Sequence, residues 1–182
     1  MFERIMGIVT LKAPTYKAVA EDEAATKQAM MIVIVVSLIQ GFVVGLMPAA
    51  GGVSFAGGLM RAVINLVFGL ASWYVSAWLL ATIAKAFGGK TDIKEMLRVT
   101  GFVYIFNLAV LLNLAGLIST SLLCITSIIA LVILVLSLIG YVIGVREAAE
   151  FSTGNAVVTA LIATVASFLV ALAGSMIAGI FA

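Results

Sequence analysis

Five apolar runs, each about long enough to cross a lipid bilayer, are the feature of this sequence that most restricts its fold. A spanning helix needs about 20 mostly apolar residues at a rise of about 1.5 Å per residue. The chain has a mean hydropathy of +1.30 and only 10% charged residues, whereas roughly a quarter of the residues in a soluble domain are charged. We therefore predict an all-α polytopic membrane protein in which residues 1–182 form a single membrane domain. The predicted spans are about 29–47, 62–84, 99–118, 121–143 and 156–181.

The boundary between the third and fourth runs is the least defined. Only the letters LIST, residues 117–120, separate them, which favours a tight hairpin. The alternative is one bent helix through both runs, which would give four spans. That helix would have about 45 apolar residues, twice the length that a bilayer requires. We therefore predict five spans.

The first 27 residues are expected to form short helices outside the spans. They carry acids and bases throughout and have no continuous apolar core, so they are not a secretory signal peptide. Phe2, Ile5, Met6 and Val9 recur at helical spacing, which predicts a short helix in the membrane interface; a frayed tail is the alternative. Pro14 suits the first turn of a second helix, polar enough for water or lipid headgroups. Residues 1–27 are thus assigned to cytoplasmic or interfacial helices.

Basic residues predict the orientation, because lysine and arginine are retained on the cytoplasmic side of a membrane. Nine of the ten fall on one side of a five-span arrangement, and only Arg61 falls on the other. The nine are Arg4, Lys12, Lys17, Lys27, Lys85, Lys90, Lys94, Arg98 and Arg146. We expect a multi-pass protein of the cell membrane with a cytoplasmic N-terminus and an external C-terminus. Four spans would move Arg146 to the outside.

Residues 88–102, GGKTDIKEMLRVTGF, form the one substantial loop between spans on the cytoplasmic side. The letters GGKT are those that end a phosphate-binding loop, but Ala84 stands where its first glycine is required, and a helix precedes it instead of a strand. A helix start explains the stretch better. The two glycines end the second span, Asp92 caps the next helix, and Glu95 completes a capping box. The loop is predicted to be an amphipathic entry to the third span.

The longer stretch GGKTDIKEMLRVTGFVYIFNLAVLL resembles the central signature of the Yip1 domain family. APTYKAVAEDEA and GVREAAEFSTGNAVVTALI are similar to the family's pre-membrane segment and to its link between the fourth and fifth spans, so the resemblance covers nearly the whole chain. It implies five spans, a cytoplasmic N-terminus and, by length, a prokaryotic source. Many bacterial and archaeal members have a proline about five residues after Gly101, where this chain has Phe106 and Asn107, a departure that bears on whether the helix breaks there.

Eukaryotic relatives in this family resemble trafficking adaptors that bind Rab-type small GTPases and one another. Their long acidic and aromatic N-terminal extension has no counterpart in this sequence, so Rab binding is not expected. The resemblance therefore implies a membrane-organising or trafficking-adaptor-like role, and the function of the prokaryotic members, which this chain resembles more closely in length, is largely unassigned.

Residue composition argues against catalysis. The chain has no histidine and a single cysteine, Cys124, which removes the usual zinc ligands, the commonest general base and any intrachain disulfide. No acid or base falls near mid-membrane, where a proton-coupled transporter or an intramembrane protease would place one. We expect no catalytic, cofactor-binding or metal-binding residues, no cofactor and no nucleic acid partner. Carboxylates at the interface could form an active site, but nothing in their spacing requires it.

Two groups of polar residues remain as candidate sites. The first is a cytoplasmic docking surface for anionic lipid headgroups or for a protein partner whose identity the sequence leaves unknown; alternatively, its bases only fix the topology. It comprises Lys90, Asp92, Lys94, Glu95, Arg98, Arg146, Glu147 and Glu150, and its bases and acids could pair at the surface. The second is the intramembrane set Asn65, Asn107 and Asn113, which suits hydrogen bonds between helices or a polar path for ions or lipid headgroups.

Two functional classes follow. The leading prediction is a non-enzymatic membrane protein with a membrane-organising or adaptor role, and the alternative is a small transporter, channel or lipid-moving protein. Small residues spaced by four, Gly41 with Gly45 and Gly174 with Ala178, predict close helix packing. Whether that packing lies within one chain or in a homodimer stays open.

Overall fold

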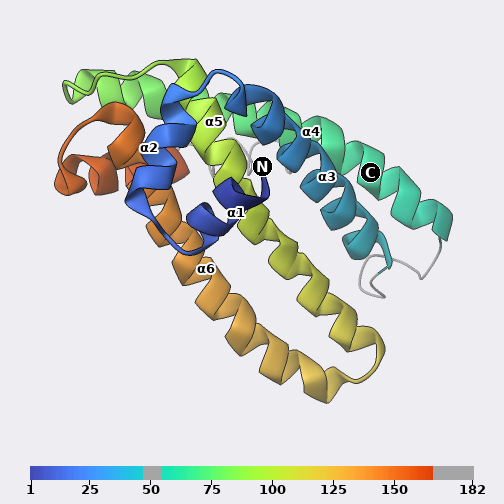
Figure 1. Ribbon diagram of the computed structural model, residues 1–182. Helices are drawn as coiled ribbons and strands as arrows, with labels where there is room; N and C mark the ends of the chain where they lie inside the picture. The colour runs from blue at the N-terminus through green and yellow to red at the C-terminus, as the bar shows by residue number, and fades with distance from the viewer. Residues whose placement is uncertain (47–54, 166–182) are drawn as a thin grey trace.

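The computed structural model describes residues 1–46 and 55–165, and these residues form helices and turns with no strand (Figure 1). The all-α prediction is confirmed over this part of the chain. The helices are α1 (Phe2–Val9), α2 (Ala13–Glu21), α3 (Ala25–Leu46), α4 (Phe55–Ala86), α5 (Ile93–Val103), the 3₁₀ helix η2 (Tyr104–Leu117) and α6 (Thr120–Ala149). A further helix covers Thr153–Val165.

Four stretches of helix are long and apolar enough to cross a membrane: Ala25–Leu46, Ala62–Ala86, Ile93–Leu117 and Thr120–Ala149. They overlap the first four predicted spans. The fifth predicted span, 156–181, starts within the helix Thr153–Val165, and its remainder lies outside the described residues.

The third and fourth spans form a hairpin. η2 ends at Leu117, and Ser119 caps α6 by accepting a hydrogen bond from the backbone N–H of Ser121 at 3.2 Å. α6 then returns along η2 (Figure 1). The tight turn predicted from the letters LIST is confirmed, and the alternative of one bent helix is wrong.

α5 continues directly into η2, so residues 93–117 form one rod (Figure 1). At Phe106 and Asn107, where the family resemblance put a helix break in question, the rod does not break. It changes from an α-helix to a 3₁₀ helix at Tyr104 and keeps that form for 14 residues, although most such runs end after about 3–4 residues. Because side chains three apart eclipse in a 3₁₀ helix, this change sets which η2 residues share a face.

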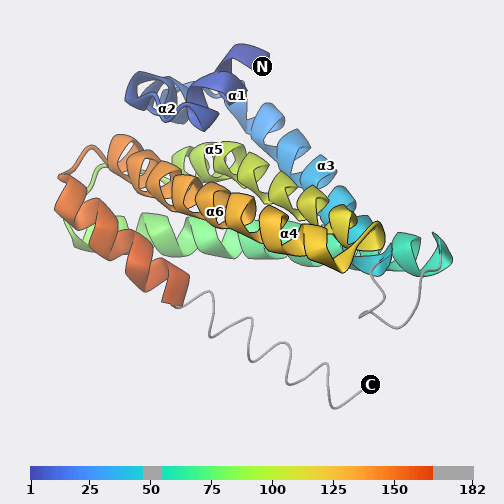
Figure 2. The ribbon, with the colours of Figure 1, turned by 90° about the horizontal axis from the view of Figure 1, so that it is seen from below.

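The N-terminal helices form a layer against α5 and α6, and α4 lies on the other side of the same pair (Figure 2). α2 ends at Glu21, where the Asp22 carboxylate accepts a hydrogen bond from the N–H of Ala24 at 2.9 Å and turns the chain. α2 was expected in water or headgroups, yet it buries Tyr16, Val19 and Ala20 against the bundle. It is therefore an integral layer of the fold.

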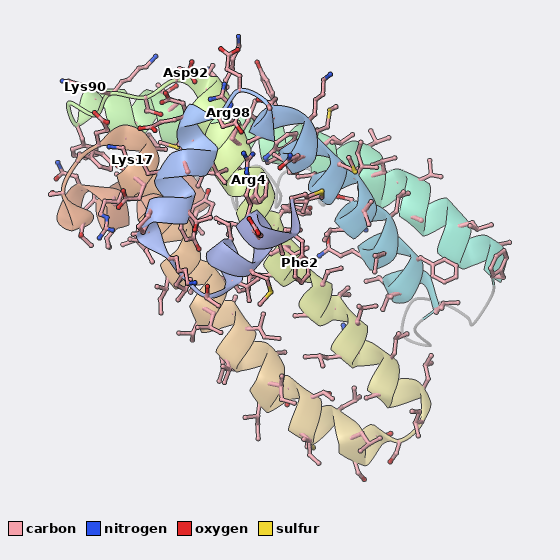
Figure 3. The ribbon with its side chains drawn as sticks, in the orientation of Figure 1. Phe2, Arg4, Lys17, Lys90, Asp92 and Arg98 are labelled. Atoms are coloured by element: carbon pink, nitrogen blue, oxygen red, sulfur yellow. The ribbon has the colours of Figure 1, made fainter. Side chains whose placement is uncertain are left out.

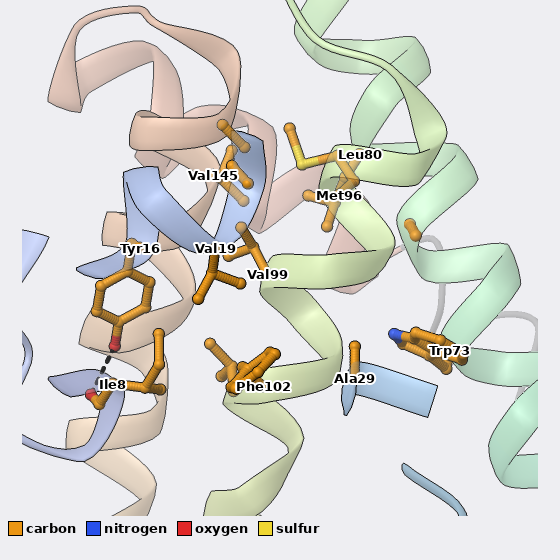
Figure 4. Packing of buried hydrophobic residues seen from close by; sticks show 14 of the residues in the cluster. Ile8, Tyr16, Val19, Ala29, Trp73, Leu80, Met96, Val99, Phe102 and Val145 are labelled. Carbon is orange, nitrogen blue, oxygen red and sulfur yellow. Dashed lines mark hydrogen bonds between the residues drawn. The ribbon is translucent and has the colours of Figure 1, made fainter. Parts of the chain in front are cut away.

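The packed core lies toward the end of the bundle that carries the α4–α5 turn (Figure 4). Tyr16, Leu80, Met96, Phe102 and Val145, from α2, α4, α5 and α6, are fully buried there. α6 differs, because the most apolar 18 residues of this helix include none that are buried. A helix that is apolar all round and leaves this much of its surface exposed is suited to lipid contact.

Candidate functional site

The α4–α5 turn is built by its two glycines. Gly88 has φ +81°, a left-handed conformation that favours glycine. The N–H of Gly89 donates to the carbonyl of Ala84 at 2.8 Å, and the N–H of Lys90 donates to the carbonyl of Ala149 at 2.9 Å. The turn is thereby held against the end of α6.

The predicted capping box at the start of α5 is confirmed. The Asp92 carboxylate accepts from the N–H of Glu95 at 2.7 Å, and the Glu95 carboxylate accepts from the N–H of Asp92 at 3.1 Å. Both carboxylates therefore stabilise the helix start.

Arg98 is not part of an exposed surface, which corrects its place in the predicted docking set. Its side chain is 4% exposed. Its Nε donates to Thr26 Oγ1 at 3.0 Å, and its guanidinium also donates to the carbonyl of Ala20, at the end of α2. Arg98, which was predicted to lie in the loop 88–102, therefore links α5 to the α2–α3 connection (Figure 3).

Asp22 lies in the same connection and pairs with Arg4 of α1. The hydrogen bonds from Arg4 and from the N–H of Ala24 hold the pKa of Asp22 below its usual value, and the positive charges of Arg4 and Arg98 add to this. Arg4 also donates to Gln28 at 3.3 Å, which links α1 to α3. The connection between α2 and α3 is therefore an ionic joint of three helices.

The acids on α6 pair differently from the prediction. Glu150 lies 3.6 Å from the ammonium of Lys17, and Glu147 lies 2.6 Å from the guanidinium of Arg146. Neither acid pairs with Lys90 or Lys94. These two lysines are exposed and have no ion-pair partner among the described residues. We call this end of the bundle, with the α4–α5 turn and the end of α6, the charged end. Its acids Glu147 and Glu150 are paired, whereas its cations Lys90 and Lys94 are free within the described part of the chain (Figure 3).

The letters LRVTG, residues 97–101, include Arg98, and the other residues of this motif hold α3, α4 and α5 together. The indole N–H of Trp73 reaches the Leu97 carbonyl at 3.2 Å and Thr100 Oγ1 at 3.1 Å. A Cβ on Gly101 would lie 2.7 Å from the Cβ of Ala29 and 3.0 Å from the Trp73 ring. Only glycine permits this approach, so the motif that carries the family resemblance is a packing node in this chain.

A second node, missed by sequence reasoning, joins α2 to α6. The Tyr16 hydroxyl donates to the Ile8 carbonyl at 2.9 Å (Figure 4), and burial raises the pKa of Tyr16. Its ring occupies space left open by Gly140 and Gly144, since a Cβ on Gly140 would lie 2.7 Å from the hydroxyl. The spacing of these two glycines by four is the sequence signal that could have indicated it.

Two cavities with several polar side chains in their lining lie along η2. The first has a volume of about 210 Å³ and is lined by Ser72, Trp73, Ser76, Thr100, Val103, Tyr104, Asn107, Ser137 and Tyr141. The second has a volume of about 280 Å³ and is lined by Gln40, Phe106, Asn107, Ala109, Val110, Asn113, Ala130, Ile133, Leu134 and Ser137. Asn107 and Ser137 line both, so the two cavities adjoin.

The 3₁₀ geometry explains the alignment. Tyr104, Asn107, Val110 and Asn113 are spaced by three, so they form one row along η2 and all face these cavities. Neither Asn107 nor Asn113 has a hydrogen-bond partner among the described residues, so the predicted hydrogen bonds between helices are not formed there. Asn65, the third predicted residue, lines neither cavity. The structure therefore brings together two of the three, with Gln40 and Ser137 added.

The pairs of small residues spaced by four were predicted to mark close helix packing. Gly41 and Gly45 are buried within the single chain, whereas Gly174 and Ala178 lie outside the described residues. Within residues 1–46 and 55–165, no three carboxylate or thiol side chains gather as a metal site would require.

Among models of protein families, the one described as the Yip1 domain matches residues 6–175. No curated protein and no solved structure matches the chain. The family match covers both nodes, the charged end and the polar cavities.

Proposed function

Since the chain belongs to the Yip1 domain family, we propose that it is a five-span protein of the cell membrane with a membrane-organising, adaptor-like role. Its N-terminus lies in the cytoplasm and its C-terminus outside. The family is in general one of non-catalytic membrane proteins, which fits this assignment. The docking surface on the cytoplasmic side consists of the α4–α5 turn and the start of α5.

The observation that carries the proposal is the imbalance of free charge at this end. Glu147 and Glu150 are paired with Arg146 and Lys17, and Asp92 and Glu95 cap a helix, whereas Lys90 and Lys94 are exposed and unpaired. A pair of exposed, unpartnered cations attracts negative charge. An acidic segment of a partner protein is the ligand that an adaptor would bind here.

The test is a pull-down of the full chain from native membranes with lipids retained. Lys90→Gln with Lys94→Gln should release acidic partners, and raised salt should do the same to the parent protein, because surface charges are screened over about 8 Å at physiological salt. Lys27→Gln, a matched exposed lysine on α3, should keep them. If the double variant keeps every partner of the parent, these lysines only fix the topology and the proposal is wrong.

A second candidate function, movement of lipids or small solutes, is favoured by the two adjoining cavities. In liposomes, the parent would raise solute flux or lipid scrambling above that of empty vesicles, and Asn107→Leu with Asn113→Leu would abolish the effect. Asn65→Leu is the control, since Asn65 lines neither cavity. Activity that follows this pattern would replace the adaptor role, and its absence in the parent would exclude this candidate.

A further inference from the structure

The α1–α2 hairpin carries an open groove that neither the packing nodes nor the proposed docking surface uses. Its volume is about 320 Å³, and it is lined by Phe2, Glu3, Met6, Gly7, Thr10, Lys12 and Thr15. Phe2 is 74% exposed and Met6 46%. The groove therefore combines the charged side chains of Glu3 and Lys12 with exposed apolar side chains.

Contacts with α6 place this groove beside the last turns of that helix and so indicate its level relative to a bilayer. The Leu11 side chain lies 3.4 Å from where a Cβ on Gly140 would be, and Lys17 reaches Glu150 at 3.6 Å. α2 therefore runs beside the last turns of α6 in the same direction. Gly140 precedes Arg146, the first charge of α6, by six residues, a distance of roughly 9 Å along the helix. The α1–α2 turn thus sits at the edge of the hydrocarbon layer.

Charges at that level need a partner. Arg4 and Lys17 have carboxylate partners, but Glu3 and Lys12 have none among the described residues. A charge at the membrane boundary is stabilised when its side chain reaches the headgroup layer. Lys12 can meet a lipid phosphate there, whereas Glu3 would repel it. A ligand that satisfies both needs a phosphate and a hydrogen-bonding cation.

We propose that the groove binds the headgroup of phosphatidylethanolamine. The Lys12 ammonium donates to a phosphate oxygen, the Glu3 carboxylate accepts from the lipid amine, and Phe2 and Met6 contact the acyl chains. Phosphatidylglycerol has no amine for Glu3, and the methylated nitrogen of phosphatidylcholine has no N–H to donate. Charge and hydrogen bonding together thus select one headgroup.

The test is native mass spectrometry of the full chain in mixed micelles of the three lipids. The parent should retain phosphatidylethanolamine above the other two. Lys12→Gln should lower its retention about fivefold, the loss expected for one surface lysine on a lipid phosphate. Glu3→Gln should lower phosphatidylethanolamine to the level of phosphatidylcholine. Lys12→Arg should keep retention, and it separates loss of charge from loss of folding.

The matched controls are Lys27→Gln and Glu23→Gln, two exposed residues without an ion pair that lie outside the groove; both should bind like the parent. If phosphatidylglycerol is retained as well as phosphatidylethanolamine and Glu3→Gln changes nothing, the groove does not read the amine and the proposal fails. It fails equally if Lys12→Gln retains all three lipids like the parent. Neither result depends on which side of the membrane the N-terminus faces.

Discussion

Single residues in this chain gain their roles from partners far away in the sequence. Asp92 and Glu95 could be predicted to cap α5, because a capping box is contained within four residues. The burial of Arg98 could not be, since its acceptors on Ala20 and Thr26 lie more than 70 residues earlier. A sequence shows where a charge is, but the acceptor that it meets depends on tertiary packing.

Replacement of Arg98 tests this role. Arg98→Gln should destabilise the attachment of α1 and α2 by about 1.5–3 kcal/mol, the range for hydrogen bonds to a charged group, because the Ala20 carbonyl and Thr26 lose their donor. Hydrogen exchange of residues 1–24 in detergent would measure it. Arg98→Lys should rescue only in part, because a lysine cannot reproduce the guanidinium fork.

Lys94→Gln is the control at this scale, because Lys94 is exposed one turn earlier on α5. Its exchange should match that of the parent. Exchange of residues 1–24 at the parent level in Arg98→Gln would mean that the α2–α3 connection is held by Arg4 and Asp22 alone.

Among the elements, the apolar spans and α1 could be predicted from periodicity and length, whereas the place of α2 could not. APTYKAVAE has few large apolar residues, so its sequence indicates a surface helix. α2 packs against the bundle because Gly140 and Gly144 of α6 leave room for the side chain of Tyr16. The 3₁₀ form of η2 was likewise missed, since an apolar run of this kind fits either helix geometry.

A side chain added at Gly144 should force α5 and α6 apart, because it would strike Val99 of α5. A Cβ on Gly144 would lie 2.3 Å from Val99 Cγ1 and 3.4 Å from the Tyr16 ring. Gly144→Ala should therefore lower the free energy of unfolding by about 1–3 kcal/mol, the usual cost of overpacking. Equilibrium unfolding in detergent would measure the loss. Gly154→Ala, with no neighbour closer than 3.9 Å, should cost nothing comparable.

The combination with Val99→Ala gives an internal check, because it removes the methyl group that the new Cβ would strike. The double variant should recover part of the loss, as a coupling energy in a double-mutant cycle. Strictly additive losses would show that the two positions do not meet, and would contradict the packing of α5 on α6.

At the scale of the whole molecule, hydropathy and charge carry most of the prediction. Four helices that are long and apolar enough to cross a membrane lie where the first four apolar runs indicated, because length and apolarity are local properties of the chain. The way these helices assemble depends on small residues and buried polar contacts, such as Trp73 with Thr100. Those depend on pairs of positions, which one sequence does not reveal.

The distribution of charge still makes a strong prediction about orientation. Nine of ten basic residues lie on one side of a five-span arrangement, so that side should be cytoplasmic. Cys124 is exposed and must first be replaced by serine. A cysteine at position 90, where the side chain is exposed, is a better reporter than one at Thr91, which is 8% exposed.

In intact cells, a membrane-impermeant thiol reagent should then label a cysteine added after Ala182 and should miss the cysteine at position 90. Permeabilised cells should label both, which confirms that the second site is reactive. Labelling of both from outside would place an even number of spans between the two positions. Between the two positions, α5 with η2 and then α6 are each long and apolar enough to cross the membrane once. That result would therefore leave the chain after Ala149 without a crossing and end the five-span arrangement.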